Sequence, residues 1–393
     1  MADNKRNFST RALWADHLSP VAGSDIAVPI HHSVTFEYHD MDEWFDVALK
    51  RKAGHIYSRN TNPTVRSLEV TMSSLEGSED AVSFSTGMAA ISNTLHTLLE
   101  PGDRVVTIKD TYGGTSKIFL EFLPRMNVDC CLCETLDFDT IEEEVRKGCK
   151  LLYLETPTNP LLKVMDIERL ARVAHEAGAL VLVDNTFATM VNQRPLELGA
   201  DLVLYSATKY LNGHSDAMGG ILCGPEELVD RVYHYREING ATLHANSAYL
   251  ILRGLKTLEL RIQRHNENAQ RIAEFLDDHH KVDKVYYPGL PHHTHHDIAR
   301  RQMDGYGGML SFSLHGDFQD VKKLVPNLTH AHAAASLGSV TTLIGPPAVT
   351  SHVELTAEER RALGIPESLI RYSAGVENLD DLIEDLKLGL ASL

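Results

Sequence analysis

The segment YSATKYLNGHSDAMGG, from Tyr205 to Gly220, places a lysine where an apolar, strand-like run gives way to a turn rich in Ser, Thr and Gly. This lysine is Lys209, and Ser206 and Thr208 come just before it. Further upstream, the apolar run GALVLVDNT leads to Asp184 at its carboxyl end. Ligands of α/β folds bind at the carboxyl ends of the strands. We therefore expect an amine, a carboxylate and two hydroxyl groups to converge at one site.

This set of groups suits pyridoxal phosphate. A lysine amine can carry the cofactor as a Schiff base, a carboxylate can keep the pyridine nitrogen protonated, and hydroxyl groups can hold the phosphate. The alternative is a surface lysine after a buried strand, which a lone lysine would favour. Because two strand ends carry polar groups, we predict catalytic roles for Lys209 and Asp184 and phosphate contacts for Ser206 and Thr208.

Length, composition and charge limit the class of protein. The chain has 393 residues, of which 43% are hydrophobic and 23% charged, which is long enough for two domains. The net charge of -17 argues against nucleic acid as a partner. No apolar run approaches the ~20 residues that cross a bilayer, and the polar N-terminus lacks a signal-peptide core. We expect a cytoplasmic protein without membrane partners, and its five cysteines suit neither a disulfide framework nor a zinc site.

The fold class follows from a regular alternation along the chain. From about Thr64 to Gly224, apolar runs of strand length alternate with amphipathic segments of helix length. This pattern predicts an α/β fold with a mostly parallel sheet covered on both faces. Helix starts are marked by Asn62 before a proline, by Asp166 and by Asn378.

The rest of the chain predicts two further parts. One long helical stretch is expected from about Ala245 to His280, followed by a mixture of strands and helices. We predict an N-terminal arm at residues 1–60, a large cofactor-binding α/β domain at 61–254 and a smaller C-terminal α+β domain at 255–393.

The segment SFSTGMAAISNTLHTLL offers donors for a phosphate group. Thr86 suits a helix cap, Gly87 permits close backbone approach, and the first N–H groups of a helix point outward. We predict that Thr86, Gly87 and Met88 bind the phosphate. Taken alone, the segment is best interpreted as an ordinary capped helix, and only its combination with Lys209 predicts a cofactor site.

Two loop residues are candidates for contacts with the cofactor ring. Tyr112, in KDTYGGT, can stack on the pyridine ring and handle a proton, although a half-buried loop tyrosine is the alternative. Asn159, in ETPTNP, can donate to the phenolic oxygen, although Asn before Pro is first of all a turn signal.

An amino-acid substrate needs a partner for its α-carboxylate. Arg371, in the strand-like run SLIRYSAG, is the best candidate because a guanidinium group matches a carboxylate with two parallel hydrogen bonds. A structural salt bridge is the competing interpretation. Ser336 can assist in substrate binding.

Together these segments resemble the Cys/Met-metabolism family of pyridoxal-phosphate enzymes, which includes cystathionine γ-synthases, cystathionine lyases, methionine γ-lyases and O-acylhomoserine sulfhydrylases. The motifs that carry the resemblance are YSRNTNPT from Tyr57, STGMAA from Ser85, YGGT from Tyr112, ETPTNP from Glu155, VDNTFA from Val183, SATKYLNGHSD from Ser206, SLG from Ser336 and IRYSAG from Ile370. The resemblance implies the aspartate-aminotransferase-like fold (fold type I) and a homotetramer built from dimers. It also implies that Tyr57 and Arg59 reach the phosphate in the neighbouring subunit.

The resemblance further implies that Lys209 moves protons at Cα and Cβ of the substrate and that Tyr112 assists departure of the group at Cγ. Our leading interpretation is a γ-lyase acting on a homoserine-derived amino acid with a sulfur or oxygen leaving group. The alternative is a γ-replacement transferase of the cystathionine γ-synthase or O-acylhomoserine sulfhydrylase type. Both activities use the same residues, so the motifs leave the two open.

The chain departs from its relatives at the distal end of the substrate. Cystathionine enzymes commonly carry acids at two positions that hold Ile56 and Ala335 here, and methionine γ-lyases typically carry cysteine where this chain has Gly114. Downstream, VTSHVELT places His352 and Glu354 near the expected pocket mouth. An acid such as Glu354 would suit a cationic side chain such as that of canavanine, and a surface or capping role is the alternative.

The cluster PHHTHH, which spans His292 to His296, raises the question of a metal site. Histidines three or four residues apart can bind zinc, but no set of carboxylates or cysteines accompanies them. We expect no metal here and interpret the cluster as an exposed, solvated helix start.

Overall fold

The computed structural model describes residues 6–18, 25–353 and 355–393. Within these limits the chain forms two compact units. The first unit comprises residues up to 98, 204–212 and 216–257, and the second comprises 99–203, 213–215 and 258–393. The division of the chain at residues 61 and 255 stays a prediction. Among the helices of the described segments, none is long and apolar enough to cross a membrane.

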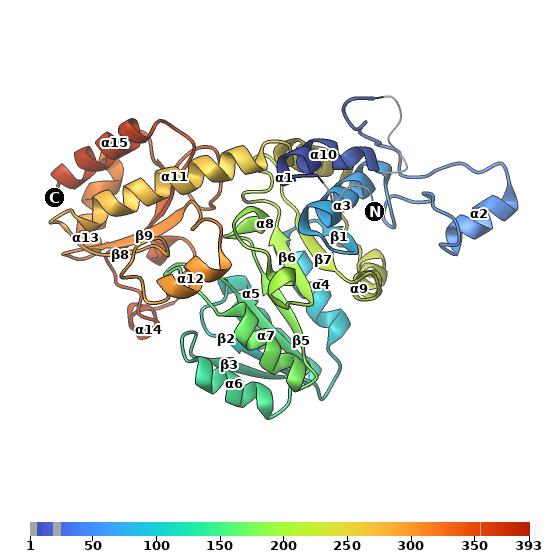
Figure 1. The fold of residues 1–393 in the computed structure, drawn as a ribbon, viewed down its shortest axis with the longest axis horizontal. Coiled ribbons are helices and arrows are strands. Elements are labelled where there is room, and N and C mark those ends of the chain that lie inside the picture. Colours follow the sequence, from blue (N-terminus) through green and yellow to red (C-terminus); the bar gives the residue numbers. More distant parts are fainter. Residues whose placement is uncertain (1–5, 19–24, 354) are drawn as a thin grey trace. The chain divides into compact units, whose positions relative to one another are not determined.

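Three helices of the first unit pack side by side: α1 (Phe8–Trp14), α3 (Pro63–Glu76) and α10 (Ala245–Leu255) (Figure 1). The predicted start of α3 is confirmed, because the side chain of Asn62 accepts a hydrogen bond from the backbone N–H of Thr64 at 3.0 Å. Leu68, Met72 and Leu75 of α3 are at most 1% exposed. Burial of such side chains contributes about 1.5–3 kcal/mol each.

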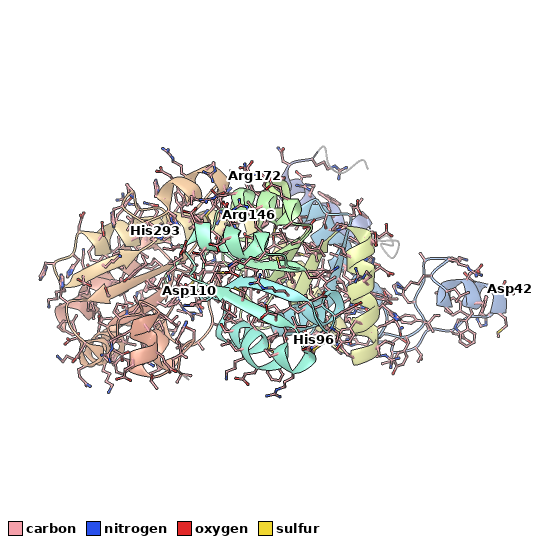
Figure 2. All side chains as sticks on the ribbon, turned by 90° about the horizontal axis from the view of Figure 1, so that it is seen from below. Asp42, His96, Asp110, Arg146, Arg172 and His293 are labelled. Carbon is pink, nitrogen blue, oxygen red and sulfur yellow. The ribbon has the colours of Figure 1, made fainter. Side chains whose placement is uncertain are left out.

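The N-terminal segment of the first unit carries α2 (Met41–Ala48) at the tip of an extended arm, where Figure 2 labels Asp42. Asp40 caps this helix by accepting the backbone N–H groups of Asp42 and Glu43. Met41, Trp44 and Phe45 remain 70%, 41% and 58% exposed. The helix therefore leaves large apolar side chains uncovered by its own chain.

Two strands of the first unit pair antiparallel: β1 (Asp80–Phe84) and β7 (Gly220–Gly224). The helices α4 (Gly87–Leu98) and α9 (Glu226–Asn239) follow them. The sequence prediction did not single out β1. Its pairing with β7 brings an antiparallel pair into a sheet whose β2, β3, β4 and β5 are parallel, an arrangement that is common in α/β proteins.

Four strands of the second unit are all parallel to their neighbours, and they are β2 (Arg104–Ile108), β3 (Asp129–Cys133), β4 (Leu151–Glu155) and β5 (Leu180–Asp184). With β6 (Leu202–Ser206), the described residues form a seven-stranded sheet in the order β1-β7-β6-β5-β4-β2-β3. Every residue of β4 is buried, as expected for a parallel strand covered on both faces. The helices α6 (Phe138–Arg146) and α7 (Ile167–Glu176) pack beside these strands. The predicted α/β class is confirmed.

A second sheet in this unit has the order β10-β11-β12-β9-β8 among the described residues. Its strands are β8 (Val282–Tyr286), β9 (Met309–Leu314), β10 (His332–Ala333), β11 (Leu343–Gly345) and β12 (Leu369–Ser373). The helices α11 (Leu258–Asp277) and α15 (Leu379–Ala391) lie against it (Figure 1). Asn378 caps α15 as predicted. The smaller α+β part is confirmed.

The remaining α-helices are short connectors in the second unit. They are α5 (Gly113–Lys117), α8 (Thr189–Asn192), α12 (His296–Gln302), α13 (Phe318–Leu324) and α14 (Ala357–Ala362).

The helical stretch predicted from about Ala245 to His280 is confirmed over most of its length, as two helices, α10 and α11, with a turn at Lys256 and Thr257 between them. The backbone N–H of Thr257 donates to the carbonyl oxygen of Gly254 at 3.2 Å. A Cβ at Gly254 would lie 2.3 Å from the backbone oxygen of Asn212. Tertiary packing therefore requires glycine here, and the apolar period does not reveal the break.

Candidate active site

Lys209 lies in a turn directly after β6 in the first unit. Its backbone N–H donates to the carbonyl oxygen of Ser206 at 3.2 Å. The hydroxyl group of Thr208 donates to the carbonyl oxygen of Gly219 at 3.3 Å, and the N–H of Gly219 donates to the same hydroxyl oxygen at 3.1 Å. These bonds fix the turn that presents the amine and both predicted hydroxyl groups.

The start of α4 supplies donors beside that turn. The hydroxyl oxygen of Thr86 accepts the N–H of Ala89 at 3.0 Å, which makes Thr86 the predicted cap. A Cβ on Gly87 would lie 2.8 Å from Cβ and 2.9 Å from Oγ of Ser206, so the helix start touches this residue. The N–H groups of Gly87 and Met88 belong to the first turn and have no intrahelical acceptor. Helix N–H groups and hydroxyl groups thus meet in one place that fits a phosphate.

The arm residues Tyr57 and Arg59 are both exposed. The guanidinium carbon of Arg59 lies 5.1 Å from the centre of the Tyr57 ring. The neighbouring Asn60 is held from inside the unit, because the buried Arg236 donates to its carbonyl oxygen at 2.5 Å and pairs with Glu69 at 3.1 Å. The segment is therefore anchored next to two side chains that point into solvent.

Asp184 ends β5 in the second unit and is buried. The N–H and the hydroxyl group of Thr186 donate to its Oδ1 at 3.0 and 2.6 Å. Burial raises the pKa of Asp184 to about 6, and the two bonds from Thr186 oppose this rise. A buried carboxylate is stabilised by a cationic donor. The protonated pyridine nitrogen of the cofactor is such a donor, so Asp184 fits its predicted role.

Glu155 is a functional candidate that the sequence analysis missed. It ends β4 in register with Asp184 on β5 and is 5% exposed. Its Oε2 accepts the backbone N–H of Tyr112 at 2.7 Å, while the Tyr112 side chain is 46% exposed. The signal was available, because an acid that ends an apolar strand is the same pattern that singled out Asp184.

Arg371 lies on β12 and is 7% exposed. One guanidinium nitrogen donates to Oδ1 of Asn159 at 3.1 Å, and the other terminal nitrogen donates to the carbonyl oxygen of Ser336 at 3.0 Å. Ser336 has a φ of 91°, a region that non-glycine residues rarely occupy. The second unit thus brings Arg371, Asn159 and Ser336 together. Because Asn159 accepts through its oxygen, its amide NH₂ group stays available as a donor.

The segment around His352 lies against the loop of Tyr112 within the same unit. A Cβ on Gly113 would lie 3.3 Å from the backbone oxygen of Ser351. Burial and the neighbouring Arg371 lower the pKa of His352 to about 4, so its ring is neutral at physiological pH. Glu354, the proposed partner of a cationic substrate, lies outside the described residues.

The interpretation of PHHTHH as an exposed, solvated cluster is wrong for several of its members. His293 is half-buried, and burial lowers its pKa to about 4. His295 bonds the carbonyl oxygen of Val164 at 3.1 Å, and His296 bonds that of Pro288 at 2.8 Å. Within the described ranges, no group of three or more His, Cys, Asp or Glu is placed to hold a metal ion. These histidines tie loops together.

Three comparisons with known proteins agree. A family model described as Cys/Met metabolism PLP-dependent enzyme matches residues 9–391. An L-methionine gamma-lyase of Fusobacterium nucleatum subsp. polymorphum is 42% identical over 396 residues, covering 100% of both chains, and a cystathionine gamma-lyase of Bacillus subtilis is 40% identical over 94% of this chain and 95% of its own. A crystal structure of cystathionine gamma synthase from Xanthomonas oryzae pv. oryzae in complex with cystathionine has a TM-score of 0.93 at 38% identity, covering 98% of each chain.

Proposed function

The chain belongs to the Cys/Met metabolism PLP-dependent enzymes, and from this premise we propose that it is a γ-lyase for a homoserine-derived amino acid. Membership confirms the predicted family, its pyridoxal-phosphate cofactor, its fold class and a lyase or transferase activity on a small amino acid. The observation that carries the finer proposal is that the chain has Ile56 just before the YSR motif and Ala335 just before the SLG motif, positions where the family resemblance implies acids in cystathionine enzymes. We propose a leaving group bound through sulfur or oxygen and free of a distal ammonium group.

The predicted site residues have defined parts in this proposal. Pyridoxal phosphate supplies an electron-accepting ring when bound, which makes the proton at Cα of an amino acid removable. Arg371 binds the α-carboxylate, for which its guanidinium geometry is suited. Asp184 keeps the ring nitrogen protonated. Thr86, Gly87, Met88, Ser206 and Thr208 hold the phosphate, and Asn159 donates to the phenolic oxygen.

Proton transfers belong to Lys209 and Tyr112 in the proposal. The amine of Lys209 takes the Cα proton and later moves protons at Cβ, so that the group at Cγ can leave. Tyr112 covers the ring and gives a proton to the leaving group, which its exposed side chain is free to approach. Its backbone is fixed by Glu155, which limits the movement of the loop.

We expect L-cystathionine to be a poorer substrate than L-methionine, with kcat/KM at least about tenfold lower. An ammonium group that enters a pocket without a compensating acid costs about 1 kcal/mol or more, and 1.36 kcal/mol is a factor of ten in rate. The measurement is kcat/KM for both substrates on the wild-type enzyme. If cystathionine is the better substrate, the inference from Ile56 and Ala335 is wrong. The variant Ala335→Glu should narrow the difference.

Canavanine tests the one acid that the sequence places near the pocket mouth. If Glu354 meets the cationic end of this substrate, Glu354→Gln should lower kcat/KM for canavanine about tenfold and leave methionine within about twofold. The control is Glu358→Gln, because Glu358 is an exposed acid a few residues along the chain. An equal effect of both variants would remove Glu354 from substrate binding.

The alternative function is γ-replacement, which the same residues support. A product assay with and without a thiol acceptor separates the two. The γ-lyase releases ammonia and a 2-oxo acid from methionine or O-acetylhomoserine without any acceptor. Formation of a thioether or thiol product only when the acceptor is present, with no 2-oxo acid in its absence, would establish the transferase.

We propose a homotetramer with shared active sites, supported by the exposure of Tyr57, Arg59 and the apolar side chains of α2. If Tyr57 and Arg59 serve the neighbouring subunit, Arg59→Ala and Lys209→Ala protomers should complement each other. Each variant alone should be nearly inactive, and random dimers of a 1:1 mixture should recover up to about a quarter of wild-type turnover, because half the dimers are mixed and each holds one intact site. Mixed dimers without activity, verified by two affinity tags, would contradict shared sites.

A further inference from the structure

Glu155 lies beside Asp184, and the proposed function gives this pairing no role. It ends β4 next to Asp184 at the end of β5, in direct register. Side chains at paired positions of adjacent strands point to the same face, and the strands lie about 4.8 Å apart. The two carboxyl groups are therefore neighbours in a buried environment, where two negative charges repel strongly.

The charged and titratable groups around Glu155 come from three strands. Asp184 faces it from β5, Tyr153 lies two residues earlier on its own strand, and Asp110 follows β2. Figure 2 labels Asp110. Lys163 neutralises Asp110, because its Nζ lies 2.8 Å from Oδ2 of that residue. Lys163 is thus an ion-pair partner of Asp110, and Asp184 and Asp110 are acids that act on Glu155 through their charge.

We propose, on the premise of the function above, that Glu155 is a positioning residue: as a neutral acid its carboxyl group holds the backbone of Tyr112 in place, while Asp184 alone carries the negative charge of the pair. The bond from the Tyr112 N–H to Oε2 of Glu155 is 2.7 Å long. It connects the loop that carries the exposed Tyr112 side chain to β4, the strand that pairs directly with β2, which precedes this loop. Glu155 acts on the reaction through Tyr112 and through the charge of Asp184.

The donors around the two acids differ in kind. Asp184 receives bonds from the N–H and the hydroxyl group of Thr186, and bonds to a charged form favour that form. Glu155 receives bonds from the backbone N–H groups of Tyr112 and Asn159, which the carbonyl oxygen of a neutral carboxyl group accepts equally well. Consistent with this division, burial and Asp184 raise the pKa of Glu155 well above its usual value, whereas the pKa of Asp184 rises to about 6.

Two substitutions separate tethering from charge. Glu155→Gln keeps an acceptor for the Tyr112 N–H and carries no charge, so kcat should stay within about threefold of wild type. Glu155→Ala removes the acceptor, and kcat should fall about 10–100-fold because a misplaced catalytic group costs on this order.

A double variant tests whether this effect is transmitted through Tyr112. In a Tyr112→Ala background, Glu155→Ala should lower kcat by less than about a further twofold. Equal losses in both single variants, or full additivity with Tyr112→Ala, would overturn the proposal.

Thermal unfolding of the holoenzyme tests the charge state without any substrate. A carboxyl group whose pKa is raised by folding stabilises the folded state below its unfolded pKa of about 4.3, and this stabilisation is lost as the pH rises toward the folded pKa. Glu155→Gln has no carboxyl group to ionise and therefore avoids this loss of stability. The Tm of the variant minus the Tm of wild type should increase by about 1–2 °C per pH unit from pH 5 to 7. The exposed control Glu176→Gln should show no trend.

If the Tm of Glu155→Gln minus that of wild type does not change with pH, or decreases as the pH rises, Glu155 is ionised and the proposal is overturned. This readout does not depend on turnover. A wrong γ-lyase assignment would therefore leave the Tm trend intact and change only the substrate used for kcat.

Discussion

Replacement of Lys209 by alanine should remove the visible absorption band of the covalently bound cofactor and lower turnover by at least about 10³-fold. The turn after β6 presents this amine beside the phosphate donors of the first unit. A single group that both binds the cofactor aldehyde and transfers protons has no substitute, and proton transfer alone contributes about 10²–10⁴-fold. The measurements are the absorbance spectrum of the purified protein and kcat with L-methionine.

The matched control is Lys150→Ala. Lys150 is exposed at the amino end of β4, the opposite end from the predicted ligands. This variant should keep both the band and the turnover of wild type. A Lys209→Ala protein that turns over at more than about a tenth of the wild-type rate would show that another group carries the proton transfers.

Replacement of Asp184 by alanine should lower kcat about 10²–10³-fold while the protein keeps most of its cofactor. Without the carboxylate the ring nitrogen loses its proton, and an electrostatic contact to developing charge is worth about this factor. Cofactor retention depends mainly on the phosphate donors, which belong to the other unit and are unchanged. The measurements are kcat and the cofactor-to-protein ratio after dialysis.

Asp139→Ala provides the control for this prediction, because Asp139 is an exposed acid in the first turn of α6. It should leave both quantities unchanged. A near-normal kcat in Asp184→Ala would remove the pyridine-nitrogen role, and complete loss of cofactor would make Asp184 a binding residue first.

The sequence predicted those parts of the fold that depend on short-range patterns. The apolar runs that lead to Asp184 and Ser206 became β5 and β6, and the caps at Asn62, Asp166 and Asn378 start helices. These features depend on residues within one turn or one strand, so local physical chemistry is sufficient.

Features that depend on long-range packing were missed. One such feature is the close approach of Gly254 to the backbone oxygen of Asn212, which lies 42 residues earlier in the numbering. Likewise His295 forms a hydrogen bond with the carbonyl oxygen of Val164. Because of this contact, the PHHTHH segment has a structural role, although the sequence predicted a solvated cluster. No local pattern encodes such contacts.

For the candidate site, the sequence identified side chains but not their connections. Arg371 was predicted as a carboxylate partner, yet its bonds to Asn159 and Ser336 join three segments that are far apart in the chain. The strand pattern could have marked Glu155, since it ends an apolar strand as Asp184 does. Its pairing with Asp184 and its bond to the Tyr112 backbone come only from strand register and tertiary structure.

Borohydride reduction followed by peptide mass spectrometry tests the central claim most directly, since every assigned role depends on which lysine binds the cofactor. The holoenzyme is reduced, digested and searched for the pyridoxyl-phosphate mass. We expect one modified peptide, the one that contains Lys209, and no modified peptide from Lys209→Ala. A pyridoxyl group on a different lysine of the wild-type protein, such as Lys163, would show that Lys209 does not bind the cofactor.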